Sequence, residues 1–222
     1  MSDENIIIEQ LSDSQISPND TFVNFKVIII GDSGVGKSSL LKRAVQNRFD
    51  ENYQATIGFE FLLMHFNVNN LKIKLQIWDT CGQELYKSLV QGFYRNTSLA
   101  IILYDVHRKE TFKNAEKWVK DIKDNSDQKI PIFIVGNKID LDKKVTTEEG
   151  KIFSTSNRAI YFTEASAKTG QQCNEIFIEA AKYLYSTYNI SGGEKNENER
   201  LKIDNVVKKP KRGCCSGPQD NN

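Results

Sequence analysis

Apolar residues are arranged in two ways along the chain, and the two arrangements alternate. Short apolar or alternating runs, typical of strands, occur at 25–30, 74–79, 130–136 and 160–162. Helical spacing places other apolar residues on two faces, which comprise Phe112, Ala115, Trp118, Val119 and Ile122, and Ile176, Phe177, Ala180, Leu184 and Tyr188. This alternation predicts an α/β fold, in which a mostly parallel sheet carries helices on both faces.

Asn69 and Asn70 stand between two segments of alternating apolar and polar residues. Asparagine accepts the left-handed backbone conformation that a two-residue hairpin turn requires. The pair therefore predicts a hairpin, and with it one antiparallel edge strand in an otherwise parallel sheet.

Both ends of the chain lack periodic apolar positions. Residues 1–20 carry five acidic side chains and no Lys or Arg, and from about residue 190 the chain is rich in Gly, Glu, Asn and Lys. Such polar segments bury too little apolar surface to fold. We therefore expect a disordered acidic extension at 1–21, one domain at 22–189 and a flexible tail at 190–222. The length of 222 residues suits this division.

Composition excludes several classes of protein. A net charge of +1 gives no overall attraction to nucleic acid, so we expect no nucleic-acid partner. No apolar run approaches the length of a membrane span, and no secretory signal opens the chain. The four cysteines, Cys81, Cys173, Cys214 and Cys215, have neither zinc-site nor disulfide spacing, which favours a reducing, cytosolic environment.

A glycine-rich segment, Gly31–Ser38, directly follows the apolar run 25–30 and precedes a helical stretch at 39–46. It matches the phosphate-binding pattern G-x-x-x-x-G-K-[ST], in which backbone N–H groups face phosphate oxygens at a helix N-terminus. Lys37 would reach the outer phosphates and the Ser38 hydroxyl would hold Mg²⁺. The alternative is an ordinary glycine-rich turn. The residues expected to contact nucleotide here are Ser33, Gly34, Val35, Gly36, Lys37, Ser38 and Ser39.

Two further segments indicate which base is bound. Asn137, Lys138 and Asp140 follow the apolar run 130–136. The Asp140 carboxylate can accept two parallel hydrogen bonds from the N1–H and 2-amino groups of guanine, whereas adenine would leave it without partners. The Lys138 stem could cover the base, and Asn137 could tie the loop to its neighbours. A later loop with Ser166, Ala167 and Lys168 could offer N–H groups to the guanine carbonyl.

The residues expected to act on the outer phosphate lie between these segments. Asp79 ends a predicted strand and would hold Mg²⁺ through a water. Gly82 would donate its N–H to the γ-phosphate, and Gln83 would orient the attacking water. Thr56 could give a second hydroxyl to Mg²⁺. The alternative interpretation of this residue is an exposed loop threonine.

The chain resembles the small GTPases of the Ras superfamily, and within it the Rab family. The resemblance rests on G-D-S-G-V-G-K-S at 31–38, Thr56, W-D-T-C-G-Q-E at 78–84, N-K-I-D at 137–140 and E-A-S-A-K at 164–168. The segments 57–61, 74–80, 93–97 and 102–106 are similar to those that distinguish Rabs. The resemblance implies a P-loop GTPase fold with six strands, and a switch of vesicle traffic that hydrolyses GTP with Mg²⁺ as cofactor.

The same resemblance implies partners and further site residues. A Rab-like protein is a monomer that meets an exchange factor, a GTPase-activating protein, a GDP-dissociation inhibitor or escort protein, and effectors. It cycles between the cytosol and the cytoplasmic face of intracellular membranes. Phe49 corresponds to the aromatic that packs against the guanine edge, and Tyr53 to a tyrosine that closes over the phosphates.

Two departures from the family pattern affect the expected chemistry. Cys81 replaces the usual alanine, and Leu85 and Tyr86 replace Phe-Arg. These departures leave open a catalytically inert nucleotide-binding adaptor. A separate alternative is an ATP-dependent, kinase-type P-loop enzyme. Asp140 and the lack of an acceptor-substrate motif argue against this second alternative.

The tail carries a basic run at 208–212 followed by Cys214 and Cys215. Paired cysteines near the end of a Rab-like chain resemble a site of double geranylgeranylation, and two lipid chains give stable anchoring. Seven more residues follow Cys215, whereas the family normally ends within a few. The alternative is a pair of exposed thiols in a disordered tail.

Overall fold

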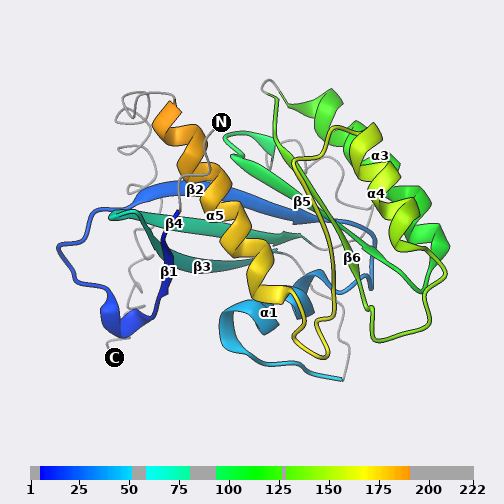
Figure 1. Ribbon diagram of the computed structural model, residues 1–222, viewed down its shortest axis with the longest axis horizontal. Coiled ribbons are helices and arrows are strands. Elements are labelled where there is room, and N and C mark those ends of the chain that lie inside the picture. Colours follow the sequence, from blue (N-terminus) through cyan, green and yellow to red (C-terminus); the bar gives the residue numbers. More distant parts are fainter. Residues whose placement is uncertain (1–5, 52–58, 81–93, 127–128, 191–222) are drawn as a thin grey trace, which may run out of the picture. The chain divides into compact units, whose positions relative to one another are not determined.

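The computed structural model describes residues 6–51, 59–80, 94–126 and 129–190, with residues 59, 60 and 80 described by their backbone only (Figure 1). The chain divides into two compact units, residues 1–187 and residues 188–222. Of the second unit only residues 188–190 are described. The described elements up to residue 187 belong to the first unit, and the predicted domain limits of 22–189 stay a prediction.

One sheet runs through the described residues. Its seven strands lie in the order β1-β3-β4-β2-β5-β6-β7. Strands β4, β2, β5, β6 and β7 are parallel, and β3 is antiparallel to both β4 and β1. The strands are β1 (Ile8–Leu11), β2 (Val23–Ile30), β3 (Phe59–Val68), β4 (Leu71–Thr80), β5 (Leu99–Asp105), β6 (Ile132–Asn137) and β7 (Tyr161–Ala165).

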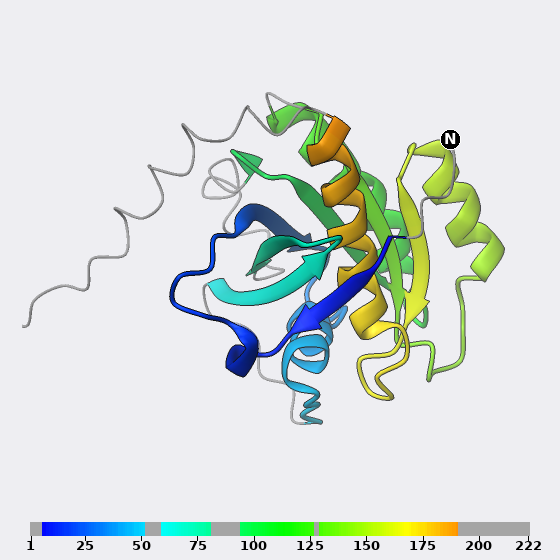
Figure 2. The same cartoon turned by 60° about the vertical axis from the view of Figure 1, so that its left-hand side comes forward.

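The predicted hairpin is confirmed at the turn between β3 and β4. Asn69 and Asn70 adopt φ angles of 46° and 69°, which are the left-handed values that such a turn needs. The expected six strands are corrected to seven, however, and β3 is not the edge. A further strand, β1, lies on its outer side (Figure 2).

Strand β1 forms within the N-terminal segment that was expected to be disordered. Ile8 pairs with Val68 and Leu11 with His65. The turn reinforces this pairing, because the Ile7 N–H donates to Asn69 Oδ1 at 2.9 Å and the Asn69 N–H donates to the Ile7 carbonyl at 3.0 Å. Only Ile8 and Leu11 of the strand are partly buried, so its side chains gave hydrophobic patterning little to detect.

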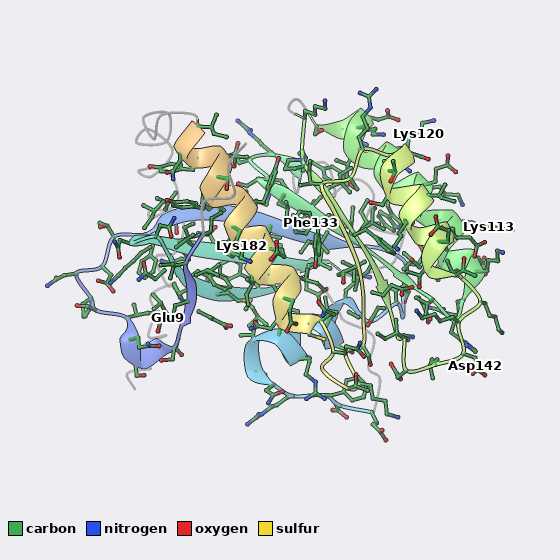
Figure 3. The ribbon with its side chains drawn as sticks, in the orientation of Figure 1. Glu9, Lys113, Lys120, Phe133, Asp142 and Lys182 are labelled. Atoms are coloured by element: carbon green, nitrogen blue, oxygen red, sulfur yellow. The ribbon has the colours of Figure 1, made fainter. Side chains whose placement is uncertain are left out.

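Helices cover both faces of the sheet, as the patterning predicted. They are α1 (Lys37–Gln46), α3 (Lys109–Asn125), α4 (Thr147–Ser156) and α5 (Cys173–Ile190). In β6, Ile132 and Ile134 join the apolar cluster that contains the buried residues of α3. Phe133 points to the opposite face, where its ring lies 6.3 Å from that of Tyr183 on α5 (Figure 3).

Both predicted apolar helix faces are largely buried, with Phe112, Trp118 and Tyr188 partly buried. Ala115, Val119 and Ile122 of α3 are almost fully buried, while Lys113 and Lys120 point away from the sheet (Figure 3). On α5 the buried residues include Ile176, Phe177, Ala180 and Leu184. Strands β5 and β6 are buried along their whole length, which explains their continuous apolar sequence.

Candidate nucleotide-binding site

Those predicted site residues that the structure describes gather where the parallel strands end. The loop Gly31–Gly36 follows β2, Asp105 ends β5, Asn137 ends β6 and Ala165 ends β7. In open α/β sheets, ligands bind outside the carboxyl ends of the strands, so this edge is the expected place for a site. The three loops that the sequence assigned to phosphate and base therefore meet at one edge.

Glycine is required at two places in the loop after β2. Gly31 and Gly36 have φ angles of 144° and 96°, which L side chains rarely adopt. A Cβ at Gly31 would meet the Leu103 carbonyl oxygen, and a Cβ at Gly36 would meet the side-chain nitrogen of Asn137. The glycines thus allow the loop to lie directly against β5 and β6.

The carbonyl oxygens of residues 31–36 all accept hydrogen bonds from donors around the loop. Lys37 Nζ donates to the carbonyls of Gly31 at 2.8 Å and Asp32 at 3.0 Å. The next four carbonyls bind, in order, Arg108 Nη2 at 3.1 Å, Lys138 Nζ at 2.7 Å, Asn137 Nδ2 at 2.8 Å and the Leu40 N–H at 2.8 Å. In a trans peptide the N–H points opposite to the C=O. The loop therefore turns its N–H groups away from these donors, as an anion-binding nest requires.

Helix α3 holds the first polar residue of the loop. Asp32 Oδ2 accepts from Asn114 Nδ2 and Asp32 Oδ1 from the Trp118 indole N–H, both at 2.8 Å. The sequence placed Trp118 in the core, which is correct for its ring, but its polar contact with the loop was missed. No short-range pattern connects two residues that are 86 positions apart.

Asn137 joins the phosphate-type loop to the base-type loop. Its amide nitrogen donates to the Val35 carbonyl at 2.8 Å, and its amide oxygen accepts the Ala167 N–H at 3.2 Å. Asn137 is fully buried, so both of its hydrogen-bonding groups are used inside the protein. This confirms the expectation that Asn137 ties its loop to neighbouring segments.

Asp140 lies beside the same loop. Its Oδ1 accepts from the Ser166 hydroxyl at 2.5 Å, and Ser166 Oγ in turn accepts the Thr169 N–H at 3.1 Å. Ser166 is fully buried, whereas Asp140 is exposed. The carboxylate is thus held in place by a rigid partner while remaining open to a ligand.

A residue that the sequence motifs did not include completes this side of the site. Arg43 of α1 donates from Nε to the Ala167 carbonyl at 2.9 Å and from Nη2 to the Lys168 carbonyl at 2.8 Å. Its guanidinium carbon also lies 5.9 Å from the ring centroid of Phe49. Phe49 is therefore placed near the 166–168 loop, as a residue flanking the base would be. An isolated arginine on an amphipathic helix gives no sequence signal for such contacts.

The oxygen donors present suit Mg²⁺. Ser38 is the second residue of α1, which follows the loop directly, and Asp79 near the end of β4 is fully buried. Asp79 pairs in register with Ile29 of β2, two residues before the loop begins. A hydroxyl and a carboxylate are ligands that Mg²⁺ accepts alongside waters and phosphate oxygens. Among the described residues no cluster of three His, Cys, Asp or Glu side chains forms an all-protein metal site.

Several predicted residues lie outside the described part of the chain. These are Tyr53, Thr56, Gly82 and Gln83, together with Cys81, Cys214 and Cys215. Among the described helices, none combines the length and the apolar character that crossing a membrane demands.

Comparison with known proteins identifies the family. The Ras family model matches residues 26–186, which include the whole site described above. This chain belongs to the Ras family. Its sheet and its phosphate-type loop are accordingly those of the P-loop GTPase fold, which confirms the predicted fold class. Members of this family are GTPases, and the Ras-family assignment supports that kind of reaction for the chain.

Relatives with Rab-type names confirm the resemblance seen in the motifs. The chain is 40% identical to Ras-related protein RIC2 of Oryza sativa subsp. japonica over 204 residues, which cover 87% of this chain and 94% of that protein. It is 38% identical to Ras-related protein RABA1b of Arabidopsis thaliana, and the match covers 86% of this chain and 94% of that protein. It is 42% identical to Ras-related protein Rab11E of Lotus japonicus, and the match covers 72% of this chain and 74% of that protein.

The contact between α3 and Asp32 can be tested by Trp118→Phe, which keeps an aromatic ring but removes the indole donor. Hydrogen bonds to charged groups contribute about 1.5–3 kcal/mol, so we expect the free energy of unfolding to fall by about 1.5 kcal/mol. Urea denaturation measures this change. In an Asp32→Ala background the same substitution should cost much less, and an equal cost in both backgrounds would contradict the assigned contact.

Proposed function

We propose that this Ras-family protein is a Rab-type switch that binds GTP and GDP with Mg²⁺ and hydrolyses GTP. In its GTP-bound form it recruits effectors in intracellular membrane traffic. The observation that carries the proposal is the pair of hydrogen bonds made by Asn137, because they bring the phosphate-type loop and the base-type loop together in one site.

Guanine selectivity follows from the geometry around Asp140. Its carboxylate would accept the N1–H and 2-amino protons of guanine, and Ser166 would hold it in the required orientation. Backbone N–H groups of the 166–168 loop would donate to the guanine carbonyl. The methylene stem of Lys138 and the ring of Phe49 would flank the base. Adenine offers no matching donors, so it would leave the carboxylate unpaired.

The phosphates would lie in the nest formed by residues 33–38. Lys37 Nζ, which donates to the carbonyls of Gly31 and Asp32, would reach the outer phosphates. Ser38, Thr56 and Asp79 would hold Mg²⁺, which neutralises charge on the β- and γ-phosphates when bound. Gly82 would donate its N–H to the γ-phosphate.

Hydrolysis would depend on Gln83, which orients the attacking water in line with the γ-phosphate. Tyr53 would close over the phosphates in the GTP-bound form. The protein itself supplies positioning and hydrogen bonds but no covalent step, so the intrinsic rate would be slow. A GTPase-activating protein would accelerate hydrolysis, and an exchange factor would replace GDP with GTP.

Nucleotide selectivity tests the core of the proposal. We expect purified protein to bind fluorescent mant-GDP, and GTP but not ATP to displace it. Asp140→Asn presents an amide donor to the guanine donors and should weaken mant-GDP binding by about a hundredfold. The matched control is Asp142→Asn, an exposed aspartate in the same loop, which should bind as the wild type does. Equal displacement by ATP and GTP would instead support a kinase-type P-loop enzyme.

Gln83→Leu tests the hydrolytic role. The variant should keep its affinity for GTP but hydrolyse it about tenfold more slowly or worse, because the water loses its orienting partner. Single-turnover release of phosphate from preloaded protein measures the rate, with the exposed Gln46→Leu as control. An unchanged rate of GTP hydrolysis in this variant would show that Gln83 does not orient the attacking water. Wild-type protein that retains GTP even with an activating protein would favour the inert adaptor.

Membrane attachment would be reversible and would use the tail. Prenyl groups on Cys214 and Cys215, with the basic run 208–212 on an anionic surface, would hold the protein at the cytoplasmic face of intracellular membranes. A GDP-dissociation inhibitor would return the monomer to the cytosol by covering the two lipid chains.

The intact mass of the protein isolated from its own cells tests this part. Two geranylgeranyl groups on Cys214 and Cys215 should add about 544 Da, or 2 × 272 Da. Cys214→Ser with Cys215→Ser should remove the added mass and the membrane-bound fraction. An unmodified mass would refute the anchor while leaving nucleotide binding untouched.

A further inference from the structure

A buried carboxylate lies behind the phosphate-type loop, outside the nucleotide motifs. Asp105 ends β5 and is 2% exposed. Its Oδ2 accepts from Arg108 Nε at 3.1 Å and pairs with Lys138 Nζ at 2.8 Å, while Oδ1 accepts the His107 N–H at 2.9 Å. Burial acts to raise the pKa of the Asp105 carboxyl, but Lys138, the His107 N–H and Arg108 lower it, and the net shift is downward. The group is therefore an anion at neutral pH.

The two cations that meet on Asp105 continue to the loop. Arg108 Nη2 donates to the Ser33 carbonyl at 3.1 Å, and Lys138 Nζ donates to the Gly34 carbonyl at 2.7 Å. The Asp105 carboxylate thus holds both cations, and each cation donates to one of two successive loop carbonyls. These are the peptide planes whose orientation decides where the N–H groups of the nest point.

The backbone around Arg108 is fixed independently of its side chain. Arg108 is the N-cap residue of α3, and its carbonyl accepts the Thr111 hydroxyl at 2.8 Å. Thr111 Oγ1 also accepts the Asp105 N–H at 3.0 Å. The corner between β5 and α3 therefore presents the guanidinium from a rigid base, although the side chain itself is 45% exposed.

We propose that Arg108, held by Asp105, is a positioning residue that clamps the Ser33–Gly34 part of the loop and slows nucleotide release. The inference rests on the proposed nucleotide binding. Release requires the nest to lose its hold on the phosphates, and rotation of the Ser33 peptide plane would break that hold. The clamp opposes this rotation because Nε and Nη2 belong to one planar fork, so the carbonyl and the carboxylate are fixed relative to each other.

The clamp predicts a distinctive pattern of variants. Arg108→Ala should release both mant-GDP and mant-GTP about tenfold faster, which corresponds to about 1.4 kcal/mol. Arg108→Lys keeps the charge but has no fork, so release should remain clearly faster than in the wild type.

The matched control is Lys109→Ala. Lys109 is the next residue along the chain and is also cationic and half exposed, but its ammonium pairs with Glu149 at 3.1 Å rather than with the loop. Removing it should leave release rates at the wild-type value. Asp105→Asn should accelerate release more than Arg108→Ala, because it frees Lys138 as well.

The experiment loads the full-length protein with mant-nucleotide and follows its release after addition of excess unlabelled GDP. Thermal unfolding of the GDP-loaded variants is recorded in parallel, so that general destabilisation is seen separately. If Arg108→Ala released nucleotide at the wild-type rate, the clamp would be overturned. It would also be overturned if Arg108→Lys released nucleotide at the wild-type rate, because only the charge would then matter. Wild-type protein that fails to load would instead overturn the nucleotide-binding proposal on which the clamp depends.

Discussion

A loop that points its N–H groups at a phosphate must point its carbonyl oxygens in the opposite direction, and the rest of this site depends on that constraint. Buried backbone oxygens without partners are costly, so each one needs a donor. In this protein the donors come from Lys37, the 137–138 segment, Arg108 and the first turn of α1. The segment 137–138 therefore contributes to the shape of the loop at 31–36, in addition to the role in base recognition that we propose for its motif.

Because the 137–138 segment supplies donors to the phosphate-type loop, the base and phosphate subsites would be coupled. Asn137 and Lys138 each have one contact with the phosphate-type loop and one with another part of the site. A displacement of either residue would alter both subsites together. The motifs are far apart in sequence because each follows a different strand, and the parallel sheet brings those strand ends to one edge.

Residues in local patterns could be predicted from the sequence, whereas residues held by long-range contacts could not. Strand β6, the hairpin at Asn69 and the motif around Asn137 all have short-range signals in composition or spacing. Arg43 and the indole of Trp118 reach the site from helices, and Arg108 reaches it from the N-cap of α3. At such positions a single polar residue looks like part of an ordinary solvent face or core. Strand β1 escaped prediction because four residues with partial burial carry no clear period.

The position of β1 has a consequence for the edge of the sheet. Its four residues pair with the last four of β3, so the N-terminus protects a row of peptide groups that would otherwise be available to another chain. Proteolytic loss of the first eleven residues would spare the hairpin between β3 and β4, whose own ladder is ten pairs long. It would, however, leave the last four residues of β3 without their partner strand, and a longer open edge favours pairing with another chain.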